Sequence, residues 1–260
     1  MTARAAGVTF DVATRRGFAE RGGQVVTVGF YLLVVAVMSS LWRSAAEAHG
    51  GSIAGYTAVA LTWYLATSEA VTVSLNARLI EDIGVEIDDG TVATEMLRPV
   101  PVLVIRVAAE VGRTLPRLLA CAVAGVGVAW LLGGAPPDLA ALGLAAPAMV
   151  LAVSCNLVAM HAFAAAGFWL RDTRSAWFLY QKLVFLLGGM LIPLEVLPDA
   201  VQSVAWALPF MAMAYAPARL ASGHVEPLLL LVQLGWLIVL GVATRAVFAA
   251  GERRLQAVGG

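Results

Sequence analysis

The sequence is poor in charged residues, and this shortage excludes several classes of protein. Charged residues fill 13% of the 260 positions and hydrophobic residues fill 60%, whereas soluble domains are about 45–50% apolar. A water-soluble globular domain is therefore excluded. The seventeen basic and seventeen acidic residues cancel, and no basic run contains interleaved aromatic residues, so nucleic acid is excluded as a partner.

The sequence contains few cysteines and lysines, and it lacks the motifs of nucleotide and metal binding. Cys121 and Cys155 lie in separate apolar runs, a spacing that fits neither a disulfide framework nor a metal pair. The histidines are far apart and form no H-E-x-x-H motif. Lys182, the only lysine, follows no glycine-rich phosphate loop. We therefore expect no metal, no cofactor and no catalytic residue in this chain.

Long apolar runs recur through the chain, and the mean hydropathy is +0.84. Each run is long enough to cross a hydrocarbon core of about 30 Å. These runs predict an all-α polytopic membrane protein with a single transmembrane domain over residues 1–260. The six predicted membrane-spanning helices cover residues 25–41, 56–75, 115–132, 148–170, 175–192 and 227–250.

The basic residues are distributed unequally between the two sides that six spans would create. Fifteen of the seventeen fall on one side, and only Arg43 and Arg219 fall on the other. Basic residues accumulate on the cytoplasmic side of membrane proteins, so both termini are predicted to be cytoplasmic. Sixteen arginines against one lysine indicate a GC-rich bacterial source, which predicts a multi-pass protein of the bacterial plasma (inner) membrane.

The N-terminal segment, residues 1–24, carries an apolar repeat at helical spacing. Phe10, Thr14 and Phe18 recur every four residues, with arginines between them. This spacing predicts an amphipathic helix at the cytoplasmic membrane surface. A disordered basic tail is the alternative.

The longest predicted cytoplasmic segment is residues 76–114. A turn at 89–90 and a helix stop at 98–99 bracket Val92 and Met96, which are spaced as an exposed apolar helical stripe. Such a helix is either a solvated linker or a docking helix for a cytoplasmic partner.

Two groups of charged residues lie next to or inside the predicted spans. Arg106, Glu110, Arg113 and Arg117 share one helix face, either as a self-paired surface stripe or as the wall of a cytoplasmic vestibule. Glu69 lies within the second span, and a second polar residue, His161, lies within the fourth. A charge inside a span is costly and faces a cavity or a partner. Structural pairing and proton coupling both remain open for Glu69 and His161.

The segment 193–226, between the fifth and sixth spans, is broken by four prolines and one glycine. These breaks predict a re-entrant external hairpin. With the N-terminal helix and the cytoplasmic helix after span two, this arrangement resembles the permease subunits of type-2 ABC exporters, particularly the viologen or multidrug exporter-like branch. The motifs that carry the resemblance are Ile87-x-x-Gly90-x-Val92-Ala93, Leu97-Arg98-Pro99, Gly188-Gly189-Met190-Leu191-Ile192-Pro193-Leu194, Leu197-Pro198, Leu208-Pro209-Phe210 and Ala216-Pro217.

The resemblance implies which residues meet the partners. It implies a coupling helix that fits a separate ABC ATPase, carried by Gly90, Val92, Met96, Leu97, Arg98 and Pro99. It also implies an external gate formed by Pro193, Pro198, Pro209, Phe210, Met211 and Tyr215. ATP and Mg²⁺ would then bind the ATPase, which is expected in two copies with two permeases. A homodimer and a heterodimer of permeases both remain open, with the heterodimer favoured.

Two functions are compatible with the sequence. The first is a permease of an ATP-driven exporter that moves an amphiphilic, drug-like or lipid-like compound outward through the lipid membrane. The alternative is a proton-coupled secondary transporter that uses Glu69 and His161. Secondary transporters usually contain internal repeats, and the two halves of this sequence show no self-similarity, which favours the exporter.

Overall fold

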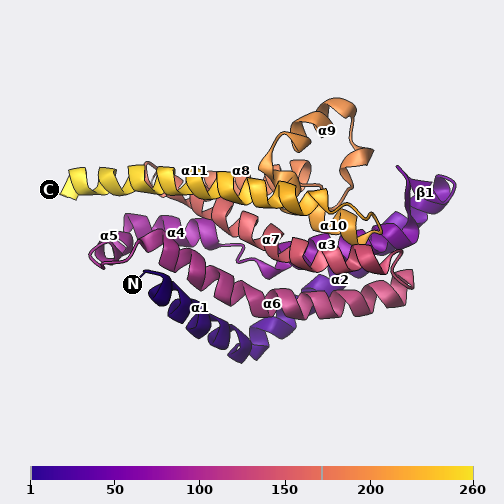
Figure 1. The fold of residues 1–260 in the computed structure, drawn as a ribbon, viewed down its shortest axis with the longest axis horizontal. Helices are drawn as coiled ribbons and strands as arrows, with labels where there is room; N and C mark the ends of the chain where they lie inside the picture. Colours follow the sequence, from indigo (N-terminus) through magenta and orange to yellow (C-terminus); the bar gives the residue numbers. More distant parts are fainter. Residues whose placement is uncertain (1, 171, 260) are drawn as a thin grey trace.

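The computed structural model describes residues 2–170 and 172–259 as an elongated helical bundle (Figure 1). In chain order, its elements are α1 Thr2–Ala19, α2 Arg21–Ala48, β1 Ser52–Ile53, β2 Tyr56–Thr57, α3 Ala58–Ser74, α4 Leu79–Asp88, α5 Thr91–Glu95, α6 Val102–Gly133, α7 Leu139–Ala164, η1 Ala165–Phe168, α8 Arg174–Leu187, η2 Leu194–Val196, α9 Asp199–Trp206, η3 Pro209–Ala212, α10 Tyr215–Ala221 and α11 Leu228–Gly259.

Five helical segments in the described part of the chain are long and apolar enough to cross a membrane. They are Arg21–Ala48, Ala58–Asp88, Val102–Gly133, Leu139–Phe168 and Leu228–Leu255. The chain is therefore an all-α polytopic membrane protein, as the sequence predicts.

The predicted fifth span, residues 175–192, differs from the structure. Helix α8 has 14 residues and a length of about 21 Å, so it is too short to cross the hydrocarbon core alone. It ends before Gly188 and Gly189, and Gly189 has a φ of +64° that favours glycine. Hydropathy continues through this glycine pair to Ile192, so an apolar average extends the span past the point where the backbone turns.

Helix α3 forms the centre of the bundle, with most of its side chains buried. The Thr57 hydroxyl caps its start by accepting a hydrogen bond from the Ala60 amide at 3.2 Å. On one side, the Tyr31 hydroxyl of α2 donates to the Ala66 carbonyl at 2.8 Å. Because α3 contacts α2, α6, α7 and α10, its residues lie close to the cavities described below.

Helix α1 packs along α6 rather than standing free. Ala13 and Gly17 are buried there, and Gly17 faces the ring of Pro116. The Phe10 backbone and the Thr14 side chain of the predicted stripe also face α6, at Gly112, whereas Phe18 is exposed together with Val8 and Val12. The predicted stripe is therefore divided between a side that packs on α6 and an exposed apolar residue, Phe18.

The bundle has two different ends. Helix α5 and both chain termini lie at one end, and the β1–β2 turn lies at the other (Figure 1). Segment 193–226, predicted as a re-entrant hairpin, consists of η2, α9, η3 and α10, none of which exceeds eight residues. Pro193, Pro198 and Pro209 stand at the starts of η2, α9 and η3. A preceding helix cannot continue through a proline, so this segment does not form one long helix.

Candidate functional site

The tip at the α5 end is a tight helix-turn-helix formed by α4, Asp89, Gly90 and α5. Gly90 has a φ of +81°, a conformation that favours glycine. Hydrogen bonding from the Thr91 side chain, and secondly from the Thr91 amide, lowers the pKa of Asp89. The amide hydrogen bond to the Asp89 carboxylate is 2.9 Å long. The turn therefore keeps a negative charge at the exposed end of the molecule.

The predicted exposed apolar stripe on α5 is wrong. Val92 is 0% exposed and belongs to the hydrophobic core, and Met96 packs against that core. A helix of five residues has little more than one turn, so its apolar residues are used for packing inward. The residues that follow α5, namely Leu97, Arg98 and Pro99, are exposed, Leu97 at 86%.

A charged cluster connects this tip to α6. Arg106 of α6 pairs with Glu86 of α4 and, at 2.8 Å, with Glu95 of α5. One turn further along α6, Glu110 pairs with Arg113. The sequence predicts the α6 charged face but not its partners Glu86 and Glu95, because three helices have to meet before these pairs exist.

The cluster lines a polar cavity of about 300 Å³ that also includes His161 of α7. Glu110 Oε2 and His161 Nε2 are buried and have no hydrogen-bond partner among the described residues. Arg117 does not line this cavity. The predicted vestibule wall therefore divides, with Arg106, Glu110 and Arg113 at the cavity and Arg117 outside it.

Glu69 lies apart from His161. Its side chain lines a different cavity, of about 600 Å³, between α2, α3 and the chain following α8. Glu69 Oε1 is buried without a described partner. The two predicted proton carriers thus share no cavity.

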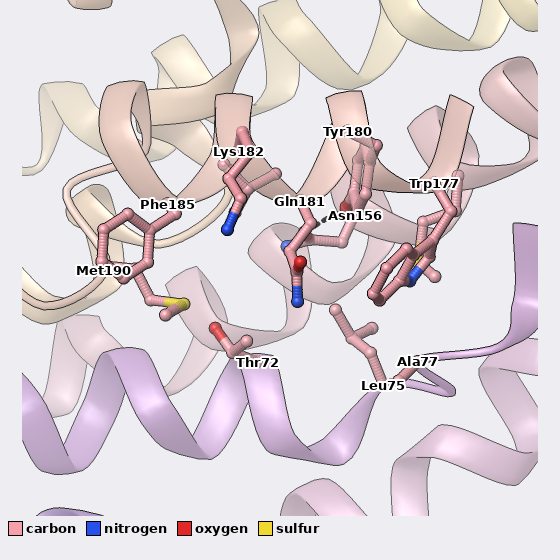
Figure 2. A pocket seen from close by; sticks show the side chains of 12 residues that line it. Thr72, Leu75, Ala77, Asn156, Trp177, Tyr180, Gln181, Lys182, Phe185 and Met190 are labelled. Atoms are coloured by element: carbon pink, nitrogen blue, oxygen red, sulfur yellow. Dashed lines mark hydrogen bonds between the residues drawn. The ribbon is translucent and has the colours of Figure 1, made fainter. Parts of the chain in front are cut away.

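A third cavity, of about 360 Å³, lies between α3, α7 and α8. Figure 2 shows Gln181 and Lys182 of α8 opposite Thr72 of α3, with Phe185 and Met190 beside them. This cavity and the Glu69 cavity have five lining residues in common, namely Thr72, Leu75, Ala77, Gln181 and Met190. The two cavities are therefore neighbours, and their charged lining residues are Lys182 in one and Glu69 in the other.

The opposite end of the molecule is held by a polar network centred on Arg219 of α10. Arg219 pairs with Glu195, donates to Glu226 at 2.8 Å and donates to the Tyr56 hydroxyl at 2.6 Å. The Tyr215 hydroxyl donates to Glu195 at 2.5 Å. The sequence predicts Tyr215 at this end but not its partners, because the partners come from four separate segments. Arg219 is one of only two basic residues on the predicted external side, and this is the one sequence feature that points to the network.

The other predicted gate residues lie in different environments. Phe210 and Met211 are buried in the hydrophobic core, Pro193 is buried, Pro209 is half-buried and Pro198 is exposed. The apolar members therefore hold the hairpin against the bundle. No three His, Cys, Asp or Glu side chains gather as a metal site within residues 2–170 and 172–259.

Comparison with known proteins shows a family. The family model described as "ABC-2 family transporter protein" matches residues 32–259. This range includes the tip, the Arg219 network and the lining of the Glu69 cavity apart from Val26, Thr27 and Phe30. No curated protein matches the chain in sequence.

Proposed function

This chain belongs to the ABC-2 transporter family and is a multi-pass permease subunit of an ABC transporter, and from that premise we propose that it exports an amphiphilic compound. The observation that carries the proposal is the pair of neighbouring, mainly apolar cavities between α2, α3 and α8, whose only charged lining residues are Lys182 and Glu69. Cavities of this kind suit a molecule with a polar head and an apolar body. We propose that the chain belongs to the viologen or multidrug exporter-like branch of this family.

We propose that a separate ABC ATPase, present in two copies, docks on the tip formed by α4, α5 and the exposed Leu97. The ion pairs of Arg106 with Glu86 and Glu95 support this assignment, because they would transmit movement of the tip to α6. ATP and Mg²⁺ would bind the ATPase, and the chain itself would have no catalytic role.

The same proposal fixes the orientation. The tip and both termini face the cytoplasm of a bacterium, and the Arg219 network faces outward. The exposed apolar face of α1, formed by Val8, Val12 and Phe18, lies against membrane lipid. The family match favours this ATP-driven function over the proton-coupled alternative, and the separation of Glu69 from His161 supports the same choice.

The docking proposal is tested with Leu97→Asp. Because Leu97 is exposed, the variant should fold normally but lose most of the co-purifying ATPase and most ATP-dependent transport of a fluorescent amphiphile in proteoliposomes. Val92→Ala is the matched control, and it should lower the melting temperature by removing a buried side chain without affecting the docking surface. Unchanged ATPase association and transport in Leu97→Asp would reject the docking site.

A further inference from the structure

We infer that the substrate of this permease carries an anionic head, which binds Lys182 in the cavity between α3 and α8. The inference rests on the proposed transport function and names the class of substrate: an amphiphile with one negatively charged group and an apolar body.

The first observation is the position of Lys182. It lies eight residues into α8, about 12 Å from Arg174, beside the exposed apolar residues Phe178 and Phe185. Its amine lies 5.1 Å from the centre of the Phe178 ring, and within the described residues no carboxylate forms an ion pair with it. Lys182 is exposed in the single chain, and an anionic ligand in the adjoining cavity would give its amine the counter-charge that no described carboxylate provides.

The second observation is which polar groups of the cavity remain available. The Tyr180 hydroxyl donates to Asn156 at 2.6 Å, and the Asn156 amide donates to two backbone carbonyls, so these two side chains are satisfied by the protein. Lys182 and Gln181 make no hydrogen bond to other described residues, and both line the cavity (Figure 2). Both present N–H donors, which match the acceptor oxygens of a sulfate, phosphate or carboxylate.

The third observation sets the direction of the ligand. The adjoining cavity is lined by apolar side chains of α2, among them Val26, Phe30 and Val34, and by Glu69. Glu69, which is only 4% exposed, presents no positive charge to an anionic head. The head is therefore placed at Lys182 and the apolar body extends toward α2.

The experiment uses the full chain in phosphatidylcholine nanodiscs, without nucleotide. Equilibrium binding of radiolabelled decyl sulfate and decyltrimethylammonium is measured below their micellar concentrations, with empty nanodiscs subtracted. We expect decyl sulfate to bind more tightly than the cation. Lys182→Gln should weaken decyl sulfate binding about tenfold, the effect of losing one charged hydrogen bond, and Lys182→Arg should restore it.

Arg174→Gln is the matched control, because it removes an exposed positive charge from the same helix outside the cavity, and it should leave binding unchanged. Equal binding by Lys182→Gln and the wild type, or tighter binding of the cation, would overturn the inference. If Lys182→Arg also loses decyl sulfate binding, the inference is overturned, because a positive charge at this position is then not sufficient for binding. The result is independent of the ATPase, so a chain that binds ATPase but not decyl sulfate refutes only this inference.

Discussion

At the scale of single residues, the Arg219 network is the clearest case of mutual dependence. Arg219 is shared between Glu195 and Glu226, and the same Glu195 accepts a hydrogen bond from Tyr215. Removing one partner leaves a partly buried charge without compensation, which costs more than the intact pair contributes. The network therefore ties η2 to α10 only while all its members are present.

This dependence predicts the result of a double-mutant cycle. Arg219→Met and Glu195→Gln should each destabilise the chain by about 1–3 kcal/mol, and the double variant should be less destabilised than the sum, with a coupling of roughly 0.5–3 kcal/mol. Thermal unfolding in a mild detergent measures all three variants. Strictly additive effects would show that Arg219 and Glu195 do not interact in solution.

His224 predicts a pH dependence at the same end of the molecule. Burial, and secondarily the positive charge of Arg219, lowers the pKa of His224 below its usual 6.5. The unfolded chain therefore binds a proton at a higher pH than the folded chain, so stability is lost as the pH falls below 6.5. The drop in melting temperature between pH 7.5 and pH 5.5 should be smaller in His224→Gln than in the wild type. An identical drop would assign the acid sensitivity to other groups.

The sequence does not determine which residues of different helices lie next to each other. The face formed by Arg106, Glu110 and Arg113 follows from helical spacing, and the structure places these residues together as expected. The proximity of His161 to Glu110, and of Glu86 to Arg106, depends on how α4, α6 and α7 pack. Spacing along one helix contains no information about that packing.

At the scale of elements, the long helices follow from hydropathy and the short ones do not. Helix α7 begins at Leu139, nine residues before the predicted start of the fourth span, because Pro147 is tolerated inside a membrane helix. Helix α8 is shorter than predicted because a glycine pair ends it. The spacing of Val92 and Met96 identifies an apolar helix face without showing which way that face points, so the predicted exposure of Val92 is wrong.

The contact between α1 and α6 allows a test of how the N-terminal helix is held. A Cβ atom at Gly112 would lie 2.6 Å from the Phe10 carbonyl oxygen, so Gly112→Ala should force the two helices apart and cost about 1–3 kcal/mol. Gly127→Ala, on the same helix but with no atom within 4 Å of the added Cβ, is the control. If proteolysis after Arg15 increases in Gly112→Ala but not in Gly127→Ala, the result supports the contact between α1 and α6. Equal stability of the two variants would contradict this contact.

At the scale of the whole molecule, a single chain leaves an apolar surface uncovered beside its cavities. Phe185 lines the cavity between α3, α7 and α8, and it is exposed together with Phe178 and Leu179 of the same helix. Five membrane-crossing helices and one short helix make a bundle too small to enclose a path for an amphiphile. A second permease placed against this face would close the path, and it would provide the second tip that a pair of ATPases requires.

We therefore predict that the working transporter contains two permeases, and we favour a heterodimer. Native mass spectrometry of the complex purified with its ATPase should give two permease subunits and two ATPase subunits. Phe185→Asp, which places a carboxylate on the open face, should reduce the permease pair to single chains because an unpaired charge in an apolar interface is strongly disfavoured. The matched variant Val123→Asp changes an exposed apolar residue of α6 that lines neither cavity beside α8, and it should leave the pair intact. A transport-competent particle with one permease would refute the prediction, whereas two copies of this chain would retain the pair and exclude the heterodimer.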